Sequence, residues 1–129
     1  MSVDPEARRI RVMIVEDHAD FRELMEVLLG RQPDIDLLAQ AGSIAEAREQ
    51  AARFELDVAI LDLGLPDGSG ADLIDDLRRD GNAVRVLVLS ASLDPEGIEK
   101  ARSSGADVIL DKLTPVGEVL ATVRRLGEA

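Results

Sequence analysis

Five short apolar runs alternate with segments of helical periodicity along this chain, and no other feature constrains the fold as strongly. The runs have strand length and are rich in Val, Ile and Leu: Ile10–Val15, Ile35–Ala41, Val58–Leu61, Val84–Leu89 and Val108–Leu110. Strands that alternate with helices over short connections form right-handed crossovers, which make the strands parallel and cover both faces of the sheet. We therefore expect an α/β fold with a five-stranded, doubly wound parallel sheet.

The helical segments are predicted from apolar residues that recur at i, i+3, i+4 and i+7 and from residues typical of helix ends. The expected buried faces of the first two helices are Phe21, Leu24, Met25 and Leu28, and Ile44, Ala47, Ala51 and Phe54. Helix ends are expected at Gly30, at a Ser43–Glu46 capping box, near Gly81, at Pro95, and at Thr114–Pro115 as N-cap and first helical residue. The helix that Pro95 begins has the fewest apolar residues, so it is the expected mobile element.

The composition limits the classes of function. A polar lead-in, residues 1–9, precedes one expected domain, residues 10–127, and 129 residues leave no room for a second domain of ordinary size. The net charge of −11, from 15 basic and 26 acidic residues, disfavours direct contact with nucleic acid or a membrane surface. Without Cys there is no disulfide, thiolate zinc site or cysteine nucleophile, and no apolar run has the length of a signal or membrane segment. We expect a cytoplasmic protein.

Polar residues follow four of the five predicted strands. Glu16 and Asp17 follow the first strand, Asp62 the third, Ser90 the fourth and Lys112 the fifth. A flavodoxin-like (βα)5 order of 2-1-3-4-5 would put the first and third strands side by side and bring the three carboxylates into one crevice at the topological switch point. Carboxylates about 4 Å apart repel by about 4 kcal/mol at an effective dielectric of about 20, so we expect a hard divalent cation, Mg²⁺, among them.

The ordered set of these polar residues resembles a known family. Lys112 would place a fixed positive charge beside the crevice and Ser90 a hydroxyl, and both groups suit phosphate oxygens. Together with Glu16-Asp17 and the segment Asp62-Leu-Gly-Leu-Pro-Asp-Gly-Ser-Gly, they resemble the receiver domain of two-component response regulators. The resemblance covers essentially the whole chain, and its motifs are weak singly but highly specific together.

The resemblance implies that Asp62 accepts a phosphoryl group from a phosphohistidine on a sensor histidine kinase or a phosphotransfer protein. The Mg²⁺ ligands would be Glu16, Asp17, Asp62 and the backbone carbonyl of Gly64. Lys112 would contact the phosphoryl oxygens, and Ser90 would move toward the phosphate. Such a chain is not an enzyme for a separate substrate, because it catalyses only its own phosphorylation and dephosphorylation.

In this family phosphorylation changes partner binding on the face formed by the fourth helix, the fifth strand and the fifth helix. The implied partners are a downstream protein target or a missing output domain, and a second copy of the chain in a homodimer through the same face. The switch residues would be Ser90 and Ile109, but the residue three before Lys112 is usually aromatic, and Ile109 cannot make the expected ring flip. The alternative is therefore a degenerate receiver that acts as a phosphorylation-independent interaction scaffold.

Other interpretations fit the residues less well. A phosphohydrolase of the haloacid dehalogenase type needs a second Asp two residues after the first, where this chain has Gly64. A flavodoxin-type cofactor binder needs a hydroxyl-rich phosphate loop after the first strand, where this chain has the two acids and His18. His18 is expected at an exposed position near a helix N-terminus, without a catalytic role. The remaining loop and helix acids are expected on solvated faces: Asp67, Asp75, Asp76 and Asp80.

Overall fold

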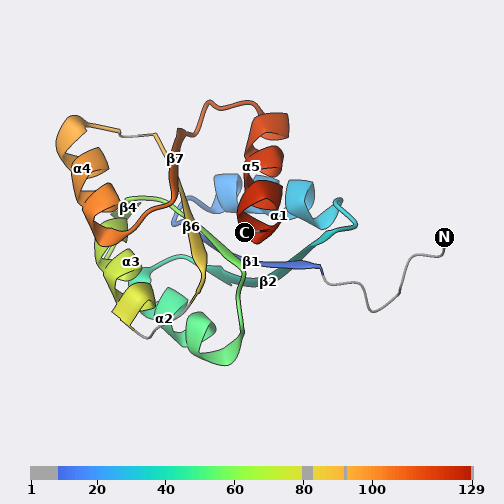
Figure 1. The fold of residues 1–129 in the computed structure, drawn as a ribbon, viewed down its shortest axis with the longest axis horizontal. Coiled ribbons are helices and arrows are strands. Elements are labelled where there is room, and N and C mark those ends of the chain that lie inside the picture. The colour runs from blue at the N-terminus through green and yellow to red at the C-terminus, as the bar shows by residue number, and fades with distance from the viewer. Residues whose placement is uncertain (1–8, 80–82, 92, 129) are drawn as a thin grey trace.

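The computed structural model describes residues 9–79, 83–91 and 93–128 of the chain (Figure 1). Five strands form its main sheet: β1 (Ile10–Val15), β2 (Ile35–Ala41), β3 (Val58–Leu61), β6 (Arg85–Ser90) and β7 (Val108–Asp111). Their order across the sheet is β2-β1-β3-β6-β7, and all neighbouring pairs are parallel. With β6 and β7 as the fourth and fifth strands, the expected order 2-1-3-4-5 and the flavodoxin-like α/β class are confirmed.

Helices cover both faces of this sheet. They are α1 (Ala19–Gly30), α2 (Ile44–Arg53), α3 (Gly70–Arg79), α4 (Pro95–Ser104) and α5 (Val116–Glu128). Figure 1 shows α1 and α5 together on one face, with α2, α3 and α4 on the other. Within the described ranges, none of these helices has the length and apolar character needed to cross a membrane. The sheet is thus enclosed between two helical layers.

Alternate residues of the central strands point into two separate aliphatic cores. In β1, Met13 and Val15 pack into the core beneath α2, α3 and α4, whereas Val12 and Ile14 pack into the core beneath α1 and α5. All four side chains are at most 1% exposed. Because both faces are covered, these strands are continuous apolar runs, and their polar residues come only where the strands end.

Two residues expected in the helical cores lie at the surface. Leu24 is 52% exposed, because the buried stripe of α1 runs through Met25 and Leu29, which are four residues apart and share one helix face. Phe54 is 37% exposed, and its extended backbone (φ −125°, ψ 144°) places it after the end of α2, where helical periodicity no longer holds. The predictions that Leu24 and Phe54 are core residues are therefore wrong.

The N-terminus of α2 is held by two side chains, of which only one belongs to the expected capping box. Ser43 Oγ accepts a hydrogen bond from the amide of Glu46 at 3.1 Å. The carboxylate of Asp67 accepts hydrogen bonds from the amides of Ile44 and Ala45 at 2.8 and 3.0 Å. These two bonds lower the pKa of Asp67. Asp67 is exposed, as expected, and in addition it caps α2 from a distant loop, which the sequence did not predict.

The loop between β3 and α3 contains a small antiparallel hairpin, β4 (Gly64–Leu65) with β5 (Gly68–Ser69). The sequence did not predict it, because strands of two residues leave no periodic pattern. Gly70, which begins α3, lies so close to the end of β3 that a Cβ at this position would overlap the backbone oxygen of Asp62. The glycine therefore allows the start of α3 to pack directly against the backbone of Asp62.

The other helix starts are close to those expected. α4 begins at Pro95, as predicted. α5 begins one residue later than predicted, because the carbonyl of Pro115 accepts the first intrahelical hydrogen bond, which makes Pro115 the N-cap residue in place of Thr114. The predicted end of the third helix near Gly81 lies outside the described residues, as does most of the predicted lead-in, residues 1–9.

Candidate functional site

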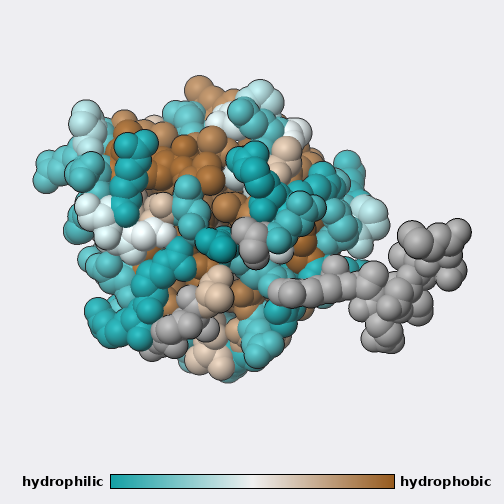
Figure 2. Space-filling view, viewed as in Figure 1, coloured by the Kyte–Doolittle hydropathy of each residue, from teal (hydrophilic) through white to brown (hydrophobic). Residues whose placement is uncertain are grey.

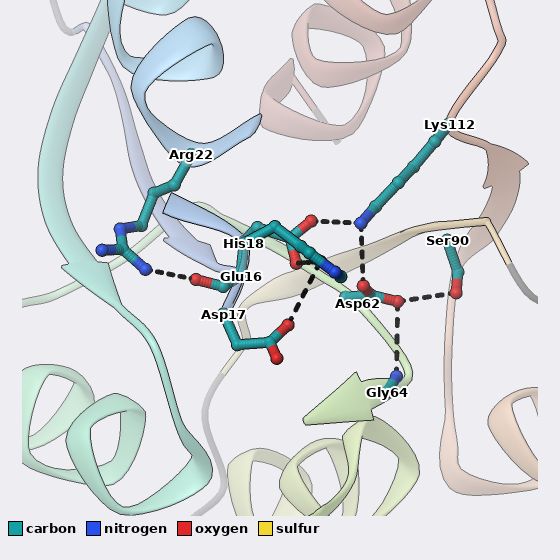
Figure 3. Close-up of polar contacts among 8 residues, drawn as sticks. All are labelled: Glu16, Asp17, His18, Arg22, Asp62, Gly64, Ser90 and Lys112. Carbon is teal, nitrogen blue, oxygen red and sulfur yellow. Dashed lines mark hydrogen bonds and ion pairs between the residues drawn. The ribbon is translucent and has the colours of Figure 1, made fainter. Parts of the chain in front are cut away.

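Four polar side chains converge at the carboxyl edge of the sheet (Figure 3). Asp62 directly follows β3, Glu16 follows β1, Ser90 ends β6 and Lys112 follows β7. The two oxygens of the Asp62 carboxylate accept hydrogen bonds from Ser90 Oγ at 2.6 Å and from Lys112 Nζ at 2.9 Å. The amide of Gly64 donates to the same oxygen as Ser90, at 3.3 Å. Both carboxylate oxygens of Asp62 thus face donors.

Glu16 is the most deeply buried acid of this group, with 2% of its surface exposed. Its Oε1 forms an ion pair with Lys112 Nζ, whereas Oε2 accepts no hydrogen bond from any residue that the structure describes. Burial raises the pKa of Glu16, and the contact with Lys112 opposes this shift only in part. Because buried polar atoms are almost always paired, a buried carboxylate oxygen without a donor is expected to have a further partner.

Asp62 and Lys112 are both charged at neutral pH. Burial alone would raise the pKa of Asp62, but the hydrogen bonds from Ser90 and Lys112 outweigh it and lower the pKa below its usual value. Burial also disfavours the charged form of Lys112, but the carboxylates of Glu16 and Asp62 outweigh it and raise the pKa of the ammonium group. The site therefore presents an ionised carboxylate held between a hydroxyl and an ammonium group.

The acids of this site can share a cation. One ligand atom from each of Glu16, Asp17, His18 and Asp62 lies within 4.8 Å of the others. Three of these atoms are carboxylate oxygens, the donors that Mg²⁺ prefers, and Glu16 Oε2, which is buried without a donor among the described residues, independently favours a cation. The donor set therefore fits Mg²⁺. The expected ligands, which are Glu16, Asp17, Asp62 and the backbone carbonyl of Gly64, stay predictions.

Two residues of α1 support the site, a role that the sequence did not predict for either; Phe21 was expected only in the buried face of this helix. The ring centroid of Phe21 lies 4.7 Å from Lys112 Nζ, within the range of a cation–π interaction. A guanidinium nitrogen of Arg22 donates to the backbone carbonyl of Glu16. Both residues closely follow the acid pair, which was the only available signal. Their partners depend on the direction in which α1 leaves β1, which no local pattern encodes.

Ile109, the expected switch position, lies in the middle of β7. Its side chain is half-buried and packs against the core that contains Ala101 of α4. In the sheet it pairs in register with Val88, two residues before Ser90. The side chain at this position is thus part of the apolar packing between β7 and α4.

Known proteins are similar to this chain in sequence and in fold. A family model described as "Response regulator receiver domain" matches residues 12–124. The nitrate/nitrite response regulator protein NarP of Escherichia coli is 35% identical over 120 residues, which cover 93% of this chain and 56% of NarP. The DNA-binding transcriptional activator DevR/DosR of Mycobacterium tuberculosis is 34% identical over 118 residues, which cover 92% of this chain and 54% of that protein.

The fold comparison agrees with the sequence comparison. A solved NarL signal receiver domain from Mycobacterium tuberculosis matches with a TM-score of 0.89 at 28% identity, covering 95% of this chain and 98% of that one. The chain spans about half the length of the curated relatives NarP and DevR/DosR. The similarity to those two proteins therefore concerns one part of each.

Proposed function

We propose that this chain, which belongs to the response regulator receiver domain family, accepts a phosphoryl group on Asp62 from a phosphohistidine of a sensor histidine kinase or a phosphotransfer protein. The observation that carries the proposal is the Asp62 carboxylate, which is 6% exposed, has a lowered pKa and is held by a hydroxyl and an ammonium donor. A carboxylate oxygen would attack phosphorus while the phosphorus–nitrogen bond breaks. The released imidazole nitrogen keeps the bonding electron pair and takes a proton from water.

Lys112 and Ser90 would stabilise the group in transfer. Both now donate to Asp62, so their donor atoms lie within hydrogen-bond reach of oxygens on a phosphoryl group attached there. Positioning and neutralisation of the equatorial oxygens are the main requirements of phosphoryl transfer. Because the chain carries both the acceptor and the supporting groups, its phosphorylation and dephosphorylation would be self-catalysed, and no separate substrate is turned over.

The proposed reaction depends on Mg²⁺, for which the site has a suitable donor set. The residues that would hold the ion are Glu16, Asp17, Asp62 and the backbone carbonyl of Gly64. When bound, Mg²⁺ neutralises negative charge on the phosphoryl oxygens and the surrounding carboxylates. The buried Oε2 of Glu16, which has no donor among the described residues, is the feature that most favours the ion.

We further propose that switching begins at Ser90 and is read on the face formed by α4, β7 and α5. The hydroxyl that now donates to Asp62 would donate to a phosphoryl oxygen and draw the end of β6 with it. Figure 2 shows hydrophobic surface gathered between α4 and α5, over β7, the edge strand whose Val108, Ile109 and Leu110 are half-buried. Because Ile109 is aliphatic, this face would change by repacking of β7 against α4.

The proposed output is a change in binding of a downstream protein target, of an attached output domain, or of a second copy of the chain through the α4–β7–α5 face. DevR/DosR, a similar protein, is named a DNA-binding transcriptional activator, and we extend a transcriptional output to this chain. Because the receiver has a net charge of −11 and would be repelled by DNA, any DNA contact would be made by the output domain. We also propose that the protein is located in the cytoplasm.

Intact-mass spectrometry after incubation with acetyl phosphate and Mg²⁺ tests the phosphoacceptor. The wild-type chain should gain the mass of one phosphoryl group, Asp62→Asn should gain none, and Lys112→Ala should gain it far more slowly. Asp75→Asn is the matched control, because Asp75 is an exposed aspartate on α3 whose loss should leave labelling unchanged. Label retained by Asp62→Asn would overturn the proposal.

The aliphatic Ile109 favours a second candidate, the phosphorylation-independent interaction scaffold. Beryllofluoride with Mg²⁺, a mimic of the phosphoryl group, separates the two in an NMR titration. For a switching receiver, amide shifts in α4, β7 and α5 should change in the wild-type chain and stay constant in Asp62→Asn. A scaffold predicts no change on this face in either protein.

A further inference from the structure

We propose that His18 is a further ligand of the divalent cation at this site, and that its nitrogen lets the site take a transition ion such as Mn²⁺ in preference to Mg²⁺. The inference rests on the cation site of the proposed function and deepens it. It gives a role in metal choice to the chain's only histidine, which the phosphotransfer chemistry does not use.

The geometry of the imidazole suits a shared ion. Nδ1 of His18 lies 3.4 Å from Asp17 Oδ1 and 3.5 Å from Glu16 Oε2 (Figure 3). With an oxygen of Asp62 included, the four ligand atoms lie within 4.8 Å of one another. Two ligands bound to one ion at about 2.2 Å are at most about 4.4 Å apart, so the four atoms need only a small adjustment to bind an ion together.

Glu16 independently indicates that this cluster has a missing partner. Its side chain is buried, and Oε2 accepts no hydrogen bond from the described part of the chain. Oε1 is paired with the ammonium of Lys112, whereas Oε2 faces Nδ1 of His18. A cation between Oε2 and Nδ1 would satisfy both atoms. A carboxylate oxygen and an unprotonated imidazole nitrogen each have a lone pair, and both lone pairs can bind the same ion.

The imidazole is not engaged in stabilising α1. His18 is the N-cap residue of the helix, but its side chain makes no capping hydrogen bond. Its side chain is 70% exposed, as expected from the sequence, so the ring can turn toward an ion without disturbing either core. The contacts that Figure 3 draws for this ring are those with Glu16 and Asp17. The ring therefore lies beside the carboxylates and does not cap α1.

The chemistry of the donor set determines the expected selectivity. Carboxylate and carbonyl oxygens suit Mg²⁺ and Mn²⁺, whereas imidazole nitrogen suits transition ions and adds little to the binding of Mg²⁺. One nitrogen added to three carboxylates should therefore strengthen Mn²⁺ binding and leave Mg²⁺ binding almost unchanged. Removal of His18 should affect the two ions differently, which a merely structural role would not do.

Pulsed electron paramagnetic resonance of Mn²⁺ bound to the untagged full chain tests the proposal. Because the sequence holds a single histidine, any hyperfine coupling from a directly bound imidazole nitrogen must come from His18. The coupling should be present in the wild-type chain and absent in His18→Gln. Calorimetry should show Mn²⁺ binding to His18→Gln weakened by about tenfold or more, the low end of losses around metal ligands, with Mg²⁺ affinity within about twofold of wild type.

Two outcomes would overturn the inference. One is Mn²⁺ bound without imidazole coupling, and the other is an equal loss of Mn²⁺ and Mg²⁺ affinity in His18→Gln. Phosphorylation of Asp62, followed separately by intact mass, distinguishes these failures from a failure of the proposed function. If acetyl phosphate labels Asp62 but no imidazole coupling exists, only the role of His18 is lost. If the coupling exists but no label forms, the metal assignment stands without the phosphoacceptor.

Discussion

Replacing Lys112 with Met should destabilise this fold strongly, and by an amount that depends on pH. The substitution keeps an unbranched side chain of similar length but removes the ammonium that pairs with Glu16 and Asp62. These carboxylates are buried, with side chains 2% and 8% exposed, so solvent can compensate little for the lost charge. The variant therefore leaves two like charges close together in a poorly solvated pocket.

The magnitude follows from the geometry. Ligand oxygens of Glu16 and Asp62 lie within 4.8 Å, where two unit charges repel by about 3.5 kcal/mol at an effective dielectric of about 20. Glu16 can relieve this repulsion by binding a proton; relative to the unfolded chain, where its pKa is ordinary, this costs about 3 kcal/mol at pH 7 and less than about 1 kcal/mol at pH 5. We expect the free energy of unfolding to fall by about 3 kcal/mol at pH 7, near the low end for a broken buried ion pair, and by less than about 1 kcal/mol at pH 5.

Urea denaturation followed by circular dichroism, with EDTA present, measures both values. The matched control is Lys100→Met, since Lys100 is the chain's other lysine and its pairing with Asp72, at 3.9 Å, joins two side chains that are each more than half exposed. It should cost less than about 1 kcal/mol at either pH. A Lys112→Met variant as stable as wild type at pH 7, or one with the same loss at both pH values, would refute the electrostatic reasoning.

Three further changes test other parts of the structure. Gly70→Ala should lower the free energy of unfolding by about 1–3 kcal/mol in urea titrations, because the added Cβ overlaps the backbone oxygen of Asp62. Asp67→Asn should lower the melting temperature at neutral pH. Because the pKa of Asp67 is lowered in the folded chain, the difference in melting temperature between the variant and wild type should shrink as the pH falls below 3.8, and it should vanish below the folded-state pKa. Phe21→Leu, in a double-mutant cycle with Lys112→Met, should give a coupling of about 0.5–1 kcal/mol for the cation–π contact.

The strands and the main carboxylate site could be predicted because both are encoded locally. An apolar run such as Val58–Leu61 ends where a doubly covered sheet meets solvent, so the next residue, Asp62, is necessarily at an edge. Side-chain partners across the fold could not be predicted in this way. Asp67 is solvated, as expected, but its role as the cap of a helix that begins 23 residues earlier in the chain was not predicted.

Helix faces were predicted only approximately, for a related reason. Apolar spacing in α1 is compatible with a stripe through Leu24 or through Leu29, and the angle at which α1 packs on the sheet decides between them. Phe54 lies beyond the last helical residue, where an extended backbone turns its ring outward. In both cases the residues were recognised as apolar, but burial depended on packing.

The sequence by itself determined the alternation of strands and helices, the aliphatic core, and which polar residues end the strands, because these follow from local periodicity and composition. Only the tertiary structure decided how those strand ends meet. It places Lys112 between Glu16 and Asp62, and among the described residues it gives Glu16 Oε2 no hydrogen-bond donor. It also turns His18 toward the acids in place of capping α1. Distances and burial of this kind arise from the packing of elements distant in the chain, and they determine the charges and ligands that the site can hold.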